Sequence, residues 1–156
     1  MPTRTPWNPV TGDTITEARL DTLPRGWLGY AEVTANQTVS VGTETDLTGL
    51  TVTVSVDANR RLKITAHGLF NRSVADGVSV ARIKEGSTEL GRFSQHSPSA
   101  ASEFDLAEGS ASITPASGSH TYKLTVQRVT GTGNVVLTAA AGSPAFILVE
   151  DLGAAS

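Results

Sequence analysis

Hydrophobic and polar residues alternate along most of this chain, which is the pattern of β-strands that bury one face. In Leu50–Val56 every second residue is leucine or valine, and the residues between them are threonine or serine. The same period resumes in Leu62–Ala66, after the turn-forming residues of Asp57–Asn59. A period of two places successive side chains on opposite faces of a strand. The pattern therefore predicts a hairpin with one buried face.

Further segments show strand character, and turn-forming stretches such as Glu85–Ser87 and Pro115–Gly118 separate them. About eight to ten short strands at this spacing predict an all-β fold, an antiparallel two-sheet jelly-roll sandwich. An immunoglobulin-like sandwich is the alternative. The further strand candidates are Gly29–Thr34, Gly77–Lys84, Glu89–Gln95, Phe104–Ile113, Thr121–Val129, Val135–Ala140 and Ala145–Glu150.

The core of the last predicted strand, Ala145–Val149, is apolar on both faces, so both faces need a cover. One face can pack in the domain core, and the other indicates a central strand or a contact between subunits. Phe146 and Leu148 are therefore the candidate residues of an oligomer interface. The aromatic residues of the later strands all fall at positions suited to a core, namely Phe70, Phe93, Phe104, Tyr122 and Phe146.

The first 25 residues differ from the rest, because four of the seven prolines of the chain lie there. We expect residues 1–25 to form an attachment arm and residues 26–156 to form the β-sandwich domain. Thr14–Leu23 begins with the spacing of a capping box and predicts one brief helix, too short to be stable alone. Such an arm docks on another protein, and its candidate contacts are Trp7, Ile15, Leu20 and Leu23.

Composition narrows the classes of function. A chain of 156 residues has room for one domain with a single core. The net charge of −3, with acidic and basic residues interspersed, offers no basic surface for nucleic acid. No stretch approaches the roughly 20 apolar residues of a membrane span, and the N-terminus lacks the apolar segment of a signal peptide. We expect a protein that is made in the cytoplasm and neither binds nucleic acid nor inserts into a membrane.

No motif indicates catalysis or a cofactor. The three histidines, His67, His96 and His120, lie in separate segments without the close-spaced pair that zinc sites usually show. The sequence contains neither cysteine nor a Gly-x-Ser-x-Gly nucleophile motif. Asp105 and Glu108 are close in sequence but lack the order of a calcium loop. We expect a non-enzymatic protein without metal or cofactor, in which His120 is an ordinary residue at a strand edge.

Aromatic residues make up 5% of the chain, so a sugar-binding platform would have to gather several of them in one place. Trp27 and Tyr30 lie close together at the start of the β-rich region. They are the candidate contacts for a glycan.

Five segments spread over the chain carry a resemblance to a known group of proteins: Gly29–Thr38, Thr43–Leu50, Arg82–Thr88, Ser117–Leu124 and Pro144–Gly153. They resemble small structural proteins of tailed bacteriophages of actinobacteria, usually labelled minor tail proteins or virion surface proteins. The stretch Trp7–Leu20 is similar to the segment by which such proteins attach to a virion. The similarity covers nearly the whole chain, but its motifs are structural.

The resemblance implies a domain similar to the trimeric jelly rolls of the tumour-necrosis-factor and C1q type. It also implies a location on the virion, as a capsid decoration or a minor tail component, with major capsid or tail proteins as partners. We therefore predict a non-enzymatic virion protein that is anchored through its arm and forms a homotrimer. The alternative is a carbohydrate-binding module of a phage tail that adheres to glycans of the host surface.

Overall fold

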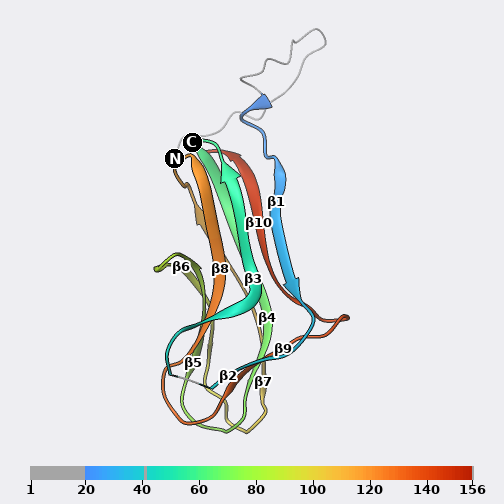
Figure 1. Ribbon diagram of the computed structural model, residues 1–156, viewed down its shortest axis with the longest axis vertical. Helices are drawn as coiled ribbons and strands as arrows, with labels where there is room; N and C mark the ends of the chain where they lie inside the picture. Colours follow the sequence, from blue (N-terminus) through green and yellow to red (C-terminus); the bar gives the residue numbers. More distant parts are fainter. Residues whose placement is uncertain (1–19, 41, 156) are drawn as a thin grey trace.

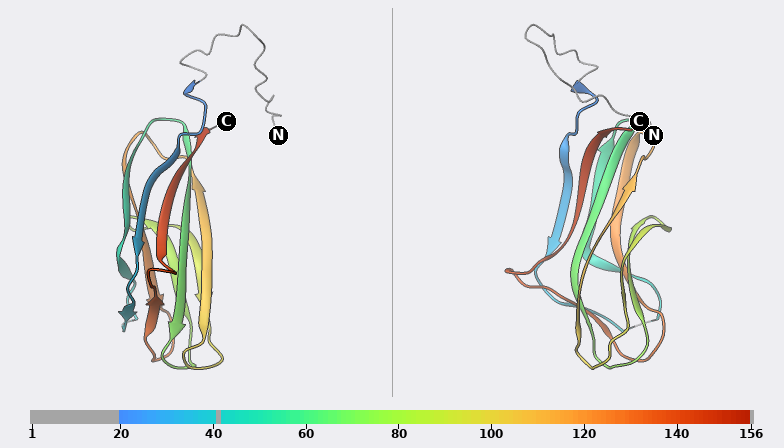
Figure 2. Two further views of the ribbon diagram at one scale, coloured as in Figure 1. Left: turned by 90° about the vertical axis from the view of Figure 1, so that its right-hand side faces the viewer. Right: turned by 180° about the vertical axis from the view of Figure 1, so that it is seen from behind.

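The structure of the protein, a computed structural model, describes residues 20–40 and 42–155. They form ten strands in two antiparallel sheets that face each other (Figures 1 and 2). Sheet A contains β1 (Gly26–Val33), β2 (Gln37–Val39), β4 (Arg60–Arg72), β7 (Phe104–Ile113), β9 (Val135–Thr138) and β10 (Ala145–Ala154). Sheet B contains β3 (Thr45–Val56), β5 (Ser79–Glu85), β6 (Thr88–His96) and β8 (Gly118–Arg128).

The long strand β4 organises sheet A. One edge of β4 pairs with β7, and the other edge pairs first with β10 and then with β9. Strand β1 follows β10 outward, and β2 follows β9. Sheet B has the order β3–β8–β5–β6. This arrangement confirms the predicted all-β jelly-roll sandwich.

The alternation in the sequence places the core between the sheets. Leu50, Val52, Val54 and Val56 of β3 are buried, and the threonines and serine between them are exposed. Strand β4 buries every second residue in the same way. The largest apolar side chains of the core are Leu47, Leu50, Leu62, Ile64, Phe70, Ile83, Tyr122, Leu124, Leu137 and Ile147.

The predicted hairpin of β3 and β4 is wrong, although both strands and their buried faces are right. Strand β3 pairs with β8 in sheet B, and β4 pairs with β7, β9 and β10 in sheet A. The turn at residues 57–59, in which Asn59 has a positive φ, crosses from one sheet to the other. A period of two fixes the face that a strand buries but not the strand with which it pairs.

Two aromatic residues of the later strands do not lie in the core. Phe104 is exposed, and Phe146 lies on the outer side of sheet A, where it is half-buried. The prediction holds for Phe70, Phe93 and Tyr122, which are buried. Alternation identifies the two faces of a strand but not which of them is buried, and β7 buries Ala107 and Ala111 while Phe104 and Leu106 face outward.

The described chain begins beside its C-terminal end (Figure 1). Ala154 donates a backbone hydrogen bond to Thr22, and Leu23 donates one to Leu20 in a single turn. Most of the predicted helix Thr14–Leu23 lies outside the described residues. Strand β1 begins at Gly26. Across the described ranges, no helix is long and apolar enough to span a bilayer.

Candidate interaction face on the outer side of sheet A

A row of aromatic side chains crosses the outer face of sheet A. The rings of Trp27 and Tyr30 on β1 are stacked, with centroids 5.8 Å apart. Tyr30 lies 5.7 Å from Phe146 on β10, and Phe146 stacks on the imidazole of His67 on β4 at 5.0 Å. We call these four residues the aromatic row. Leu148 lies beside it, because its backbone pairs with that of Tyr30.

Strand β7 extends the apolar surface to the far edge of the sheet. Leu106 is 66% exposed and pairs with Leu69 of β4, and Phe104 is 58% exposed and pairs with Asn71. We call Phe104 and Leu106 the β7 ledge. Exposed large apolar side chains that occur singly are ordinary, but a contiguous group marks a surface that another molecule covers. The left view of Figure 2 shows β1, β10, β4 and β7 side by side across this face.

Two polar atoms beneath the outer face lack hydrogen-bond partners among the described residues. They are the Thr65 hydroxyl oxygen and Nδ1 of His67. The carboxylate of Glu108 is the nearest ionic neighbour of His67, at 3.6 Å from Nδ1. A buried polar group without a partner is costly, so these two atoms lower the stability of the sheet at this place.

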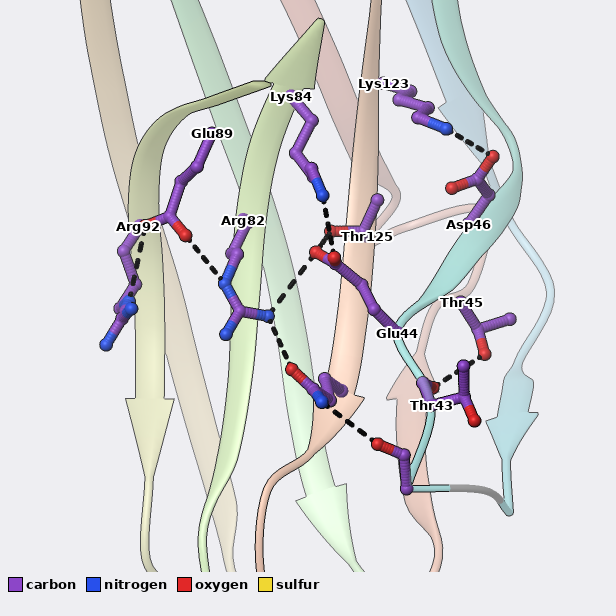
Figure 3. Close-up of polar contacts among 12 residues, drawn as sticks. Thr43, Glu44, Thr45, Asp46, Arg82, Lys84, Glu89, Arg92, Lys123 and Thr125 are labelled. Atoms are coloured by element: carbon purple, nitrogen blue, oxygen red, sulfur yellow. Dashed lines mark hydrogen bonds and ion pairs between the residues drawn. The ribbon is translucent and has the colours of Figure 1, made fainter. Parts of the chain in front are cut away.

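The outer face of sheet B is different, because its polar groups are paired with one another. Glu44 accepts hydrogen bonds from Lys84 at 2.7 Å and from the Thr125 hydroxyl at 2.6 Å (Figure 3). Arg82 binds Glu44 and Glu89, at 3.4 and 2.9 Å. Burial alone would raise the pKa of Glu44, but the hydrogen bonds of Lys84 and Thr125 and the nearby cations outweigh it and lower this pKa.

The remaining contacts of this network follow the same pattern. Asp46 binds Lys123 at 2.8 Å, and the hydroxyls of Thr53 and Thr121 are 2.8 Å apart. A surface on which charges neutralise one another is well solvated and gains little from being covered. The contrast between the two outer faces identifies that of sheet A as the candidate interaction face.

The structure brings together residues that sequence reasoning assigned to two different sites. Trp27 and Tyr30 were candidates for a glycan, and Phe146 and Leu148 for an oligomer interface. All four lie on the outer face of sheet A, because β1 pairs with β10 across more than a hundred residues of sequence. The two assignments stay predictions, but they now concern adjacent parts of one surface.

The candidate arm contacts lie partly outside the described residues. Trp7 and Ile15 fall in the part of the chain that is not described, whereas Leu20 and Leu23 are exposed. The segment that carries them is held by Arg60, whose guanidinium donates to the carbonyls of Asp21 and Leu23.

The three histidines lie in three different places. His67 is on the outer face of sheet A, and Nδ1 of His96 is 3.9 Å from Asp105 at the end of β6. His120 lies near the start of β8, where β8 pairs with β3 but not yet with β5, whose pairing begins at Tyr122. Within the described ranges, no three histidine or acidic side chains gather in a way that could hold a metal ion.

The acidic residues of β7 also diverge. Residues three apart on a strand point to opposite faces, so Asp105 and Glu108 are not a carboxylate pair. Asp105 accepts a hydrogen bond from the Ser94 hydroxyl at 2.8 Å, whereas Glu108 faces outward beside His67.

Sequence reasoning missed the β7 ledge and the role of Arg60. The ledge was missed because Phe104 was placed in the core; the available signal was that Phe104 and Leu106 share one strand face with Glu108 and Ser110, whereas Ala107 and Ala111 occupy the other. Arg60 opens β4 next to a turn, which looks like an ordinary solvated position. Its ion pair with Asp151, at 2.7 Å, joins residues 91 positions apart, and no local pattern indicates such a contact.

Comparison with known proteins supports the fold. No family model and no curated protein matches the sequence. Among solved structures, dimeric latent PorU from Porphyromonas gingivalis is similar with a TM-score of 0.51 and 12% identity, over 84% of this chain and 13% of PorU. The chain thus spans a small part of that protein.

Two further structures are similar over most of this chain. Eiger TNF from S. frugiperda gives a TM-score of 0.47 with 16% identity, over 85% of this chain and 96% of Eiger. A chain of the infectious bursal disease virus Gt strain gives 0.49 with 15% identity, over 84% of this chain and 38% of the viral chain. At these identities the likeness concerns the fold alone.

Proposed function

We propose that this protein is a non-enzymatic structural protein of a bacteriophage particle, which assembles as a homotrimer through the outer face of sheet A. The observation that carries the proposal is the contrast between the two sheet faces. The outer face of sheet B pairs its own charges, whereas that of sheet A leaves Phe146 and Leu148 of β10 half-buried and exposes the β7 ledge.

A second copy of the chain is the partner that this face fits. Besides its apolar side chains, the face carries both signs of charge, with Lys63 on β4 and Glu108 and Glu150 on the neighbouring strands. A surface with both signs contains its own electrostatic complement, as self-association requires. The outer side chains of β10, Phe146 and Leu148, lie near the middle of this face.

The place on a virion rests on the resemblance of the sequence to phage structural proteins. In this proposal, residues 1–25 attach the trimer to a major capsid or tail protein, and the sandwich is displayed outward as a capsid decoration or minor tail component. The root of this arm is tied to the domain, since Arg60 holds the carbonyls of Asp21 and Leu23. The last described residues of the arm are therefore fixed to the sandwich.

Deletion of residues 1–24 tests the attachment. We expect the truncated protein to keep the circular dichroism spectrum of a β-sandwich but to be absent from purified virions. Full-length protein expressed in the same host is the control. Incorporation of the truncated protein at normal occupancy would show that a face of the domain, and not the arm, is the anchor.

The non-enzymatic character is tested separately. Protein purified without chelator should contain no stoichiometric zinc, and incubation with bacterial cell-wall polysaccharides should release no products. Turnover that disappears when Asp105 or Glu108 is replaced, with the fold intact, would contradict the proposal.

A further inference from the structure

The edge strand β1 carries two exposed aromatic side chains, and one of them, Trp27, is the most exposed aromatic residue of the described chain. Trp27 is 68% exposed and Tyr30 is 43% exposed. Their ring planes are 18° apart and the rings are stacked, so Tyr30 supports Trp27, which presents an exposed, flat apolar ring surface. Such a surface matches the apolar face of a pyranose ring, because the amphipathic rings of Trp and Tyr combine a flat apolar body with a polar group.

A hydrogen-bonding group is fixed at the end of this surface. The Tyr30 hydroxyl donates to Oε2 of Glu32 at 2.6 Å, which holds the carboxylate in place. A carboxylate can accept about four hydrogen bonds, so Glu32 keeps acceptor capacity for the hydroxyls of a ligand.

A recess of about 570 Å³ continues from Glu32 along the chain. The recess is a shallow depression that is open to solvent, which suits a ligand that lies along the surface. Its lining is rich in hydroxyl and amide groups, and comprises Glu32, Val33, Thr34, Ala35, Asn36, Gln37, Thr38, Thr48 and Gly49. Hydroxyls and amides are the groups that hydrogen-bond a sugar.

Hydrogen bonds fix two of the side chains that line the recess. The Gln37 amide donates to the carbonyl of Thr48 at 2.7 Å and accepts from its N–H at 2.8 Å. Oδ1 of Asn36 accepts from the N–H of Ala139 at 2.9 Å, which directs the amide and leaves its NH₂ group as a donor. A preorganised wall binds without the entropic cost of ordering its side chains.

The acidic residues around the site favour a ligand without negative charge. Glu32 is the charged residue of the recess lining, and Glu150 pairs with Trp27 in the neighbouring strand. Two carboxylates beside the platform disfavour an acidic sugar, because like charges in a binding site are repulsive.

We infer that the β1 edge is a binding site for a neutral oligosaccharide, in which the Trp27 ring, supported by Tyr30, stacks on one sugar ring and the recess beyond Glu32 receives the next units. The site lies at the rim of the proposed trimer face, on an edge strand. It is therefore an additional function of the assembled protein.

The test is isothermal titration of the full-length protein with four hexasaccharides. Three are neutral, with glucose, mannose or N-acetylglucosamine units, and the fourth is an oligogalacturonate. We expect at least one neutral probe to bind and the acidic probe to bind at least tenfold more weakly. Absence of binding by all three neutral probes, or a preference for the acidic one, would overturn the inference.

Variants locate the site. Trp27→Ala and Tyr30→Ala should weaken binding of the neutral probe at least tenfold, and Glu32→Gln should weaken it less. Val129→Ala is the control, because Val129 is an exposed apolar residue that follows β8 of sheet B, outside both the β1 edge and the proposed trimer face, and this variant should bind the neutral probe as the wild type does. Unchanged affinity of Trp27→Ala would refute the site.

Sedimentation of the same variants separates this inference from the proposed trimer. Trp27→Ala should keep the oligomeric mass of the wild type while losing the sugar. If Trp27→Ala instead fails to assemble, the aromatic pair belongs to the oligomer interface and the saccharide site is wrong.

Discussion

Replacement of Arg60 by methionine should destabilise the fold more than any change to a surface arginine. The Arg60 side chain is 4% exposed and that of its partner Asp151 is 1% exposed. Arg60 donates to both carboxylate oxygens of Asp151, at 2.8 and 2.7 Å, and to the carbonyls of Asp21 and Leu23. Methionine fills a similar volume but makes none of these four hydrogen bonds.

The magnitude follows from the group that is left behind. In Arg60→Met, the buried carboxylate of Asp151 keeps one neutral donor, the N–H of Gly153 at 2.7 Å. Removing one partner of a buried ion pair costs about 3 to 5 kcal/mol, because the remaining charge is uncompensated. For a domain of this length such a loss lowers Tm by roughly 6 to 20 °C.

Urea unfolding followed by circular dichroism measures this loss. Arg25→Met is the matched control, since the side chain of Arg25 is 46% exposed in its ion pair with Asp57, and its replacement should cost far less. A loss below about 1 kcal/mol for Arg60→Met would refute the argument that the pair is structurally required. Equal losses in the two variants would do the same.

Two further predictions concern stability. Both ring nitrogens of His120 face acceptors, Glu85 at 2.6 Å and the carbonyl of Ala116 at 2.9 Å. The hydrogen bond with Glu85 is the main reason that the pKa of His120 is raised, whereas burial of the ring acts to lower this pKa. Protonated His120 therefore stabilises the folded state fully below the pKa that this histidine has in the unfolded chain, and this stabilisation disappears as pH rises through the raised pKa of the folded state. His120→Gln should lower the free energy of unfolding in urea by about 1 kcal/mol at about pH 5 and change it little at about pH 9. A loss that does not depend on pH would contradict this. Gly29→Ala should cost about 1 to 3 kcal/mol, because its Cβ would lie 2.4 Å from a methyl group of Val52, whereas the control Gly142→Ala meets nothing within 4 Å; equal unfolding midpoints would contradict the clash.

The sequence was sufficient to predict the strands because alternation is a local property. The bounds of β7, Phe104–Ile113, agree with the prediction, and β3 and β4 bury the residues that the period of two selects. Strand β2 was missed, since its three residues Gln37–Val39 are too few to establish a period. Alternation does not indicate which strands pair with each other. The sequence therefore predicted a hairpin of β3 and β4, although β3 belongs to sheet B and β4 to sheet A.

The candidate site depended on contacts between distant segments. The two apolar faces of the last strand indicated Phe146 and Leu148 as interface residues. The closeness of Trp27 and Tyr30 in the sequence indicated these two as glycan contacts. Only the pairing of β1 with β10 shows that these residues share one surface. The β7 ledge joins that surface through the pairing of Leu106 with Leu69, which the sequence does not reveal.

The oligomeric mass in solution tests the central claim most directly. Sedimentation equilibrium at micromolar concentration should give about 49 kDa for the wild type, three times the 16.2 kDa of the chain. Leu148→Glu places a charge in the outer face of sheet A and should give about 16 kDa, while Thr53→Glu on the outer face of sheet B should remain trimeric. A monomeric wild type, or a trimer that Thr53→Glu disrupts and Leu148→Glu does not, would contradict the assignment of this face.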